Sequence, residues 1–225
     1  MNELSFLSAM KLTFLGTSGM VPTKERNVQG LYLDYNGEGI LLDCGEGTQR
    51  QLQFAGLNAQ KIKVILISHW HGDHVGGLMG LLQTIGNFSG DEKQVKLFGP
   101  PGTKEYMNHL RQSCIFDAKI FVEIVEVDAP TQKIIHETND YMIKAERLDH
   151  GVYCLGYRFE EKVKRRMNQA KLNKLGIKGP LVGKLQNGES VEVQGRMITS
   201  DEVSMLSEPR SVSFIFDTQI CDACF

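Results

Sequence analysis

The chain has 225 residues, an ordinary globular composition and a formal net charge of −2, so it can bury a sizeable core in one large domain or in a domain with an insertion. No apolar run approaches the roughly 20 residues that a membrane helix needs, and residues 1–10 lack the basic start and the long apolar stretch of a signal peptide. These features exclude an integral membrane helix and a secretory leader, and they indicate a cytoplasmic protein with no membrane partner.

Short apolar runs bounded by Gly, Asn and Asp predict strands, and longer amphipathic stretches predict helices. The predicted strands span 11–16, 31–35, 40–43, 63–67, 95–98, 121–127, 141–145, 153–159 and 212–216. The predicted helices span 46–55, 75–85 and 104–112. Strands that alternate with helices in this way indicate an α/β layered domain.

The segment HWHGDH follows the predicted strand at 63–67, and its ligand-type side chains are His69, His71, Asp73 and His74. Imidazole and carboxylate groups suit zinc and similar divalent ions, and the first two histidines, two residues apart at the end of an extended run, should project to the same side. Gly72 should let the backbone turn sharply, so that the second pair aims at a neighbouring point. The segment therefore predicts two metal sites. A polar surface loop is disfavoured, because three of the six histidines in the chain lie here.

Two metals need further ligands, and two residues at strand ends are candidates. His150 follows a predicted strand in RLDHG, and Asp217 ends an apolar strand in FIFDT, where a carboxylate could bridge both ions. Spacing alone also permits a hydrogen-bonded loop histidine and a strand-end cap. His109 and His136 lie in polar stretches, and we expect them at the surface.

The five cysteines are odd in number and scattered, which argues against a disulfide framework. Cys221 and Cys224 form a CxxC motif, which fits a redox pair or half of a zinc knuckle. No second CxxC is present and the pair lies at the end of the chain, so we expect no special role for it.

Residues 99–104 (GPPGTK) look like a phosphate-binding loop between a strand and a helix. That motif requires a Gly before the Lys and a hydroxyl residue after it, whereas here Thr103 precedes Lys104 and Glu105 follows. The segment is therefore predicted to be a strand-to-helix turn.

Residues 161–184 have a local charge of +7, so the rest of the chain totals −9. The cations are Lys162, Lys164, Arg165, Arg166, Lys171, Lys174, Lys178 and Lys184. Such asymmetry is typical of a polyanion-binding element or of a solvated Lys-rich helix, and charge alone does not separate the two. Gly and Pro cluster in the second half, which indicates an arm that projects from the body and is not part of its core.

HWHGDH resembles the signature of the metallo-β-lactamase superfamily, and nearly the whole chain resembles ribonuclease Z, a family of endonucleases that remove 3′ trailers from precursor tRNA. The similar segments are LTFLGTSGMVPTKERN (12–27), LLDCGEGTQRQL (41–52), ISHWHGDHVGGLMGLL (67–82), LDHGVYCLGYRFEE (148–161), GIKGPLVGKLQNGESV (176–191) and FIFDTQIC (214–221). The metal loop alone identifies the superfamily. GEGTQRQL together with the 176–191 segment is much more specific.

The resemblance implies an α/β metallo-β-lactamase fold, an αβ/βα sandwich, over 11–225, with a flexible basic tRNA-binding arm inserted at 160–196. It also implies two Zn²⁺ ions per chain. His69, His71 and His150 would hold one ion, Asp73 and His74 the other, and Asp217 would bridge them.

The function implied by the resemblance is a zinc-dependent endoribonuclease in which a metal-bound hydroxide attacks the phosphodiester that joins the trailer to the tRNA. Asp73 would orient or deprotonate the nucleophile, and Asp43 and Asp149 would hydrogen-bond to ligand imidazoles. The residues expected at the RNA are Lys24 and Arg26, with Asn27, at the acceptor stem, and Lys162, Lys164, Arg165, Arg166, Lys171, Lys174 and Lys178 on the arm. The family usually forms homodimers.

The chain departs from the family after Asp217. Full-length members continue with a His-Glu motif, a His-Ser-Thr motif and a final His that completes the second zinc site, and none of these precedes Phe225 here. We therefore expect a C-terminally incomplete enzyme whose second metal lacks one ligand. Two alternatives follow: a tRNA-binding but catalytically impaired fragment, and another hydrolase of this fold, such as a thioesterase or lactonase.

Overall fold

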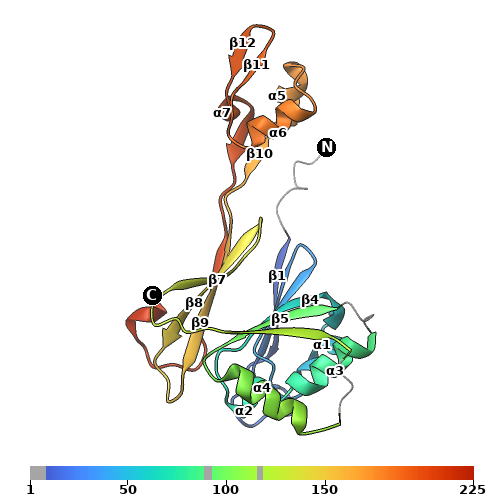
Figure 1. Cartoon of the computed structure of the whole chain (residues 1–225), viewed down its shortest axis with the longest axis vertical. Coiled ribbons are helices and arrows are strands. Elements are labelled where there is room, and N and C mark those ends of the chain that lie inside the picture. The colour runs from blue at the N-terminus through green and yellow to red at the C-terminus, as the bar shows by residue number, and fades with distance from the viewer. Residues whose placement is uncertain (1–8, 89–92, 116–118) are drawn as a thin grey trace. The chain divides into compact units, whose positions relative to one another are not determined.

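The computed structural model describes residues 9–88, 93–115 and 119–225. The prediction that residues 1–10 are not a signal peptide falls mostly on residues 1–8, which lie outside the described residues. The chain divides into two compact units (Figure 1). Unit 1 comprises Met1–Ile135, Ala145–Tyr157 and Phe214–Phe225, and unit 2 comprises His136–Lys144 and Arg158–Ser213. Within the described ranges, no helix has both the length and the apolar character needed to cross a membrane.

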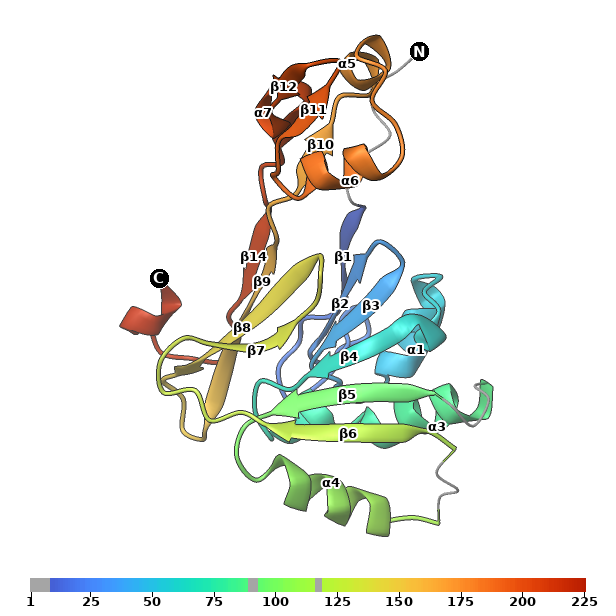
Figure 2. The same cartoon turned by 45° about the horizontal axis from the view of Figure 1, so that its top comes forward.

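Unit 1 contains a six-stranded sheet whose strands lie side by side in chain order (Figure 2). They are β1 (Met10–Gly16), β2 (Gly30–Tyr35), β3 (Glu38–Leu42), β4 (Ile62–Leu66), β5 (Gln94–Gly99) and β6 (Phe121–Glu126). The first three pair antiparallel, and β3 to β6 pair parallel. Asn36 and Gly37 join β2 to β3 with φ of 53° and 85°, the left-handed conformations of a two-residue hairpin turn.

Both faces of this sheet are covered. Tyr32 and Leu33 point to opposite faces because they are consecutive in a strand, yet they are 0% and 1% exposed. One face packs against α1 (Thr48–Phe54), α3 (Leu78–Phe88) and α4 (Thr103–Gln112). Each fully buried aliphatic side chain there adds roughly 1.5–3 kcal/mol of stability.

A second sheet has the order β14-β9-β8-β7. Its strands are β7 (Lys133–Glu137), β8 (Tyr141–Leu148), β9 (Cys154–Glu161) and β14 (Ser211–Phe214). Within unit 1, the N–H of Leu155 donates to the carbonyl of Ser68 at 2.9 Å, and the hydroxyl of Tyr157 donates to the carbonyl of Ile67 at 2.7 Å. These two bonds fix β9 beside the loop that follows β4.

Unit 2 contains β10 (Arg165–Met167), α5 (Gln169–Lys174), α6 (Pro180–Gln186), β11 (Val191–Val193), β12 (Arg196–Ile198), α7 (Ser200–Val203) and β13 (Ser204–Leu206). Its buried apolar side chains form a cluster of their own: Leu172, Ile177, Leu185, Val191, Ile198 and Val203. Composition alone did not predict this cluster, because Gly and Pro residues separate its members along the chain.

Three element predictions need correction or addition. The single helix predicted at 75–85 is wrong, because α2 (Gly72–Val75) and α3 are separated by a turn at Gly76 and Gly77. Gly72 does not supply a special turn, since it is the first residue of α2. Strand β7 was missed, because its charged sequence KIIHE shows no clear alternation.

The GPPGTK segment is the predicted strand-to-helix turn. β5 ends at Gly99 and α4 begins at Thr103. The carboxylate of Glu126 accepts the N–H groups of Gly102 and Lys104, each at 3.0 Å. An acidic side chain of the protein therefore occupies the helix N-terminus, where a bound phosphate would otherwise lie.

Replacing Gly77 by Ala should destabilise unit 1. A Cβ there would lie 2.1 Å from the carbonyl oxygen of Gly45, which is backbone and cannot swing aside. We expect Gly77→Ala to lower the free energy of unfolding by about 1–3 kcal/mol, the typical cost of overpacking.

Gly72→Ala is the matched control, since a Cβ at Gly72 meets nothing within 4 Å. Urea unfolding of both metal-free variants, followed by tryptophan fluorescence, measures the difference. Equal midpoints for the two variants would contradict the close approach at Gly77.

Candidate metal centre

The metal loop begins where β4 ends. Ile67 continues the strand direction and donates its N–H to the carbonyl of Phe98 at 2.8 Å. Ser68 and His69 follow, and both are completely buried. The apolar strand therefore carries polar side chains directly into the interior, where an unsatisfied imidazole would be costly.

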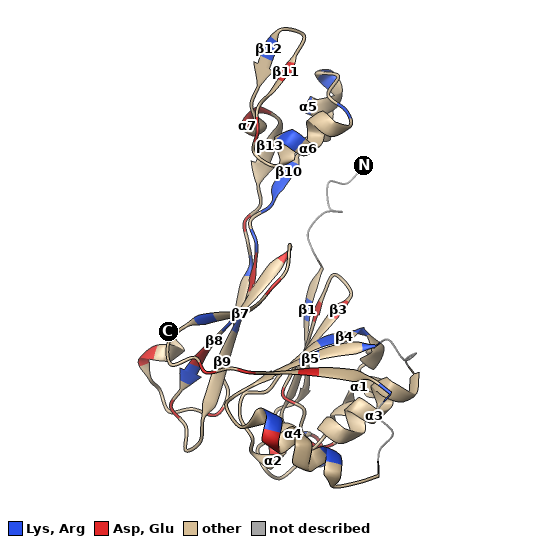
Figure 3. Cartoon of the chain, in the orientation of Figure 1, with Lys and Arg blue, Asp and Glu red and all other residues tan. Residues whose placement is uncertain are grey.

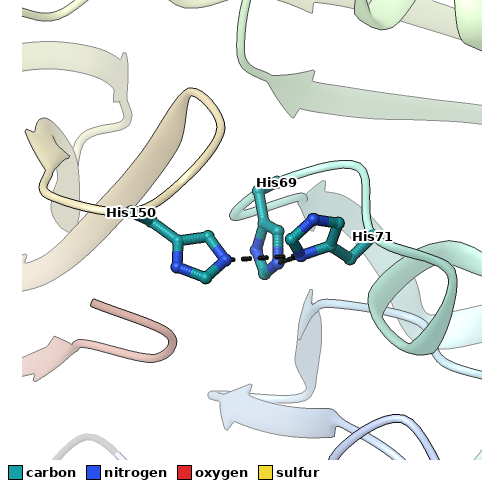
Figure 4. Close-up of side chains that lie close together, drawn as sticks. All are labelled: His69, His71 and His150. Carbon is teal, nitrogen blue, oxygen red and sulfur yellow. Dashed lines mark hydrogen bonds between the residues drawn. The ribbon is translucent and has the colours of Figure 1, made fainter. Parts of the chain in front are cut away.

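His69, His71 and His150 converge on one point (Figure 4). Nε2 of His69 lies 2.9 Å from Nδ1 of His71, and Nε2 of His150 lies 3.3 Å from the same Nδ1. Nitrogens bound tetrahedrally to one zinc ion would be about 3.3 Å apart. The donor set and its spacing therefore fit a metal ion, and the three histidines predicted for one site are together.

A second group shares His69 and adds His74 and Asp217. Nε2 of His74 lies 3.6 Å from a carboxylate oxygen of Asp217 and 3.6 Å from one of Asp73. His74 and Asp73 are buried, whereas the Asp217 side chain is 49% exposed. Imidazole and carboxylate donors on one side and three imidazoles on the other give two neighbouring places for divalent ions.

The backbone around α2 is held by Cys44, which directly precedes the GEGT segment (45–48). The N–H of Cys44 donates to the carbonyl of His74 at 2.7 Å, and the N–H of Gly77 donates to the carbonyl of Cys44 at 2.8 Å. A Cβ at Gly45 would lie 2.2 Å from the carbonyl oxygen of Asp73. Glycine at this position therefore allows the two backbones to approach closely enough to position α2.

Asp43 orients His74 from behind. This fully buried residue has φ of 55°, a conformation that Asp tolerates better than most residues. Its carboxylate accepts Nδ1–H of His74 at 2.7 Å, the N–H of Ser68 at 2.7 Å and the Ser68 hydroxyl at 2.8 Å. The first bond fixes the tautomer that leaves Nε2 of His74 free to bind a metal.

His69 is oriented through Ser68. The Ser68 hydroxyl donates to Asp43, so its oxygen accepts from Nδ1 of His69, which lies 3.0 Å away. The proton is therefore on Nδ1, and Nε2 faces His71. Sequence reasoning missed Ser68, although its place next to His69 was a usable signal. It also missed Cys154, whose sulfur lies 3.9 Å from Nδ1 of His69 and which no motif marked.

The surroundings shift the pKa values of His69 and His74 in opposite directions. Burial, followed by the neighbouring His74, His71 and His150, lowers the pKa of His69 to about 3, so its imidazole is neutral and available as a ligand. Burial also opposes the charged form of His74. The hydrogen bond and charge of Asp43, with Asp217 and Asp73, outweigh that effect and raise the pKa of His74.

Asp149 takes part through its backbone and not through the predicted imidazole contact. Its carbonyl accepts the N–H of Gln219 at 2.7 Å and the hydroxyl of Thr218 at 2.9 Å. These bonds join the loop of His150 to the segment of Asp217.

The predicted RNA-facing residues of unit 1 lie on an exposed loop. Lys24 and Arg26 are exposed there, and the N–H of Arg26 donates to the Thr23 hydroxyl at 3.0 Å. Asn27 has a structural role, because its amide donates to the carbonyl of Glu46 at 2.7 Å. His109 and His136 were both expected at the surface, and neither belongs to the two metal groups. His109 is exposed on α4, as predicted, whereas His136 in β7 is only partly exposed, because its ring contacts that of Tyr141 in β8.

Unit 2 holds the basic segment, but acidic residues of the same unit balance much of its charge (Figure 3). Its 12 Lys and Arg residues face 9 Asp and Glu residues, a net charge of +3. The ion pairs include Lys162–Glu137, Lys164–Asp140 and Arg165–Asp201, and the Lys171 ammonium donates to the carbonyl of Glu202. Among the described residues, Arg166, Lys174 and Lys178 are exposed and form no such ion pair.

Solved structures with similar folds define the class. Human tRNase Z, short form, superposes with a TM-score of 0.61 at 30% identity, covering 67% of this chain and 64% of that one. The metallo-β-lactamase fold protein YhfI from Bacillus subtilis superposes with a TM-score of 0.52 at 20% identity, covering 67% of this chain and 57% of that one. A diphosphatase of the PhnP family superposes with a TM-score of 0.51 at 22% identity, covering 66% of this chain and 61% of that one. The fold is the metallo-β-lactamase fold, as predicted from the sequence.

Curated relatives define the family. Ribonuclease Z of Methanothermobacter thermautotrophicus is 39% identical over 218 residues, covering 95% of this chain and 69% of the relative. Ribonuclease Z of Nocardia farcinica is 37% identical over 215 residues, covering 96% and 70%. The chain therefore belongs to the ribonuclease Z family, a family of endonucleases, which confirms the resemblance.

Two further findings describe the extent of these likenesses. The chain spans between 62% and 70% of the length of the ribonuclease Z relatives. Residues 10–164 also match the family model described as Anti-Pycsar protein Apyc1. That match ends one residue before β10, whereas the ribonuclease Z relatives match unit 2 as well.

Metal affinity should fall as the pH falls through the raised pKa of His74, because a metal must displace the proton from Nε2. In Asp43→Asn the anionic partner is lost, so the pKa of His74 falls and the decline in affinity moves to lower pH. Above that decline, affinity should be about 10- to 100-fold weaker, the usual cost of losing a partner behind a ligand.

Competition with a chromophoric zinc chelator between about pH 5.5 and 8, the range in which histidines titrate, measures both effects. Asp34→Asn is the control, since Asp34 accepts a backbone N–H in the β2–β3 turn. An unchanged pH profile in Asp43→Asn would contradict the role given to Asp43.

Proposed function

We propose that this chain is a Zn²⁺-dependent endoribonuclease that removes the 3′ trailer from precursor tRNA. The proposal rests on one observation above all: five side chains of metal-binding type converge in unit 1 as two groups that share His69, and Asp73 lies beside His74. Membership of the ribonuclease Z family supplies the substrate class. The proposal includes a cytoplasmic location and a homodimer, and an inserted tRNA-binding arm at 160–196.

The residues of the centre would each perform a defined task. His69, His71 and His150 would hold one ion, and Asp73 and His74 the other, with Asp217 between them. Divalent ions bound there lower the pKa of water and neutralise charge on a phosphodiester.

Asp73 would accept the proton of the attacking water. It is only 8% exposed, and one carboxylate oxygen lies 3.6 Å from Nε2 of His74. A carboxylate at that distance can orient a water molecule at the centre and receive its proton. Asp43, through His74, would keep the neighbouring ligand in place while this occurs.

The basic unit favours an RNA substrate over the small substrates of other hydrolases with this fold. The family match described as Apyc1 stops at residue 164, whereas ribonuclease Z relatives align through the basic segment. Cations that neutralise phosphates supply sequence-independent affinity for RNA. A thioesterase or lactonase has no use for such an element.

Removing Asp73 should abolish most cleavage. We expect Asp73→Ala to lower the rate of 3′ trailer removal by about 100-fold or more, the scale of a lost general base. A chelator should have a comparable effect, reversed by added Zn²⁺. Cleavage of a radiolabelled precursor tRNA under single-turnover conditions measures both.

Glu105→Ala, which removes an exposed carboxylate on α4, is the control. Metal counting should accompany the assay. About two ions per chain together with full cleavage would support the proposed enzyme. If the chain binds tRNA without cleaving it and holds one ion or none, the proposal of an enzyme would be wrong and the chain would be a tRNA-binding protein.

The cations of unit 2 should differ in their contribution to tRNA binding. The double variant Lys174→Gln, Lys178→Gln removes two exposed charges. The negative slope of the logarithm of the binding constant against the logarithm of the salt concentration should therefore become shallower by about 1.4–1.8. Lys164→Gln is the matched control, because Asp140 already pairs with that ammonium.

Filter binding of precursor tRNA at several salt concentrations gives the slopes. If Lys164→Gln lowers the slope as much per charge as the double variant, the division into paired and unpaired cations is wrong. Unchanged binding in both variants would show that none of these three lysines contributes to RNA binding.

A further inference from the structure

The CxxC motif lies on the segment that follows Asp217 in unit 1. The sulfur atoms of Cys221 and Cys224 are 3.6 Å apart, both thiols are free, and both residues are partly exposed. The pair is held in place by η2 (Asp222–Cys224), in which the N–H of Cys224 donates to the carbonyl of Cys221 at 3.0 Å. Two thiols at this distance can meet a common ligand or join to each other.

A zinc knuckle does not fit the surroundings. A structural zinc site needs four ligands. Among the described residues, the groups of three or more metal-type side chains within 4.8 Å are the two histidine groups, and neither contains Cys221 or Cys224. Two sulfur atoms without a third donor favour bond formation between them.

The cysteines also differ in the pKa of their thiols. A backbone hydrogen bond at Asp149, with weaker bonds from Cys224 and Thr218, lowers the pKa of Cys221. Burial instead raises the pKa of Cys44 and of Cys154 to about 12. Since the thiolate is the reactive form, Cys221 is the favoured nucleophile among these.

We propose that Cys221 and Cys224 form a reversible dithiol–disulfide couple that controls how firmly the segment of Asp217 is held at the metal centre. The oxidant would be a small-molecule disulfide. The Cys221 thiolate attacks one of its sulfur atoms and releases one thiol, and a mixed disulfide forms. The Cys224 thiolate then attacks the Cys221 sulfur and releases the second thiol, so two thiols are oxidised and one disulfide is reduced.

The segment is connected to both sides of the centre. Gln219 and Thr218 both bond to the carbonyl of Asp149, next to His150, and Thr218 follows Asp217 directly. The sulfur of Cys224 also lies 3.9 Å from the carbonyl oxygen of Gln219. A Cys221–Cys224 disulfide, with its sulfur atoms about 2.05 Å apart instead of 3.6 Å, would close a short loop directly after Thr218 and Gln219. Such a loop has fewer conformations than the open dithiol, so we expect the segment that follows Asp217 to be held more firmly. This coupling rests on the proposed metal centre.

The first experiment follows the bond itself. The full chain is incubated with reduced or oxidised glutathione, and its intact mass and thiol-blocked peptides are measured. We expect loss of two hydrogens and a Cys221–Cys224 crosslink, reversed by reduced glutathione. Cys114→Ser, which removes an exposed lone thiol, should still form it, whereas Cys224→Ser should stop at a glutathione adduct on Cys221. Adducts on Cys114 without the crosslink would overturn the proposal.

The second experiment measures zinc release to a chromophoric chelator. Release from the oxidised chain should be slower by about tenfold, the lower end of effects from groups around a ligand, and redox state should not matter in Cys224→Ser. Equal release rates with the crosslink formed would overturn the coupling. Absence of bound zinc in both redox states would instead overturn the proposed metal centre, while the mass result would stand.

Discussion

The carboxylate of Asp43 is buried at the end of β3, where it accepts hydrogen bonds from Ser68 and His74. A buried carboxylate is costly without partners, and an imidazole at the interior end of a strand has no fixed orientation of its own. Each group therefore satisfies the other. Because Ser68 in turn orients His69, one side chain sets the direction of ligands in both metal groups.

Close backbone approach is the second constraint on the centre. Gly45 and Gly77 have no Cβ, so the adjoining Cys44 can bond through its backbone to His74 in α2 and to Gly77. The distance between Asp43 and His74 depends on that contact, since both residues flank it along the chain. The motif thus acts through its lack of side chains as much as through the side chains it has.

Much of the fold and of the site followed from the sequence because both depend on local patterns. Apolar runs located the strands of the first sheet, and the spacing of His69 and His71 after a strand predicted their convergence. Their places at strand ends made His150 and Asp217 candidates, but only the family resemblance assigned them to the ions, since they reach the centre by tertiary packing. Cys154 was missed for the same reason, whereas Ser68 was missed although it is the neighbour of His69 in the sequence. The apolar cluster of unit 2 was missed because its members are separated by turns that hide any periodicity.

Unit 2 has its own apolar cluster. The stretch 162–210 of this unit connects β9 to β14, which are neighbours in the second sheet. The two ends of that stretch are joined by the N–H of Glu161, which donates to the carbonyl of Arg210 at 2.9 Å. A hairpin connection with a core of this kind can be gained, lost or exchanged in evolution without disturbing the strands that flank it. The substrate range of such a scaffold can therefore change while its metal chemistry stays the same.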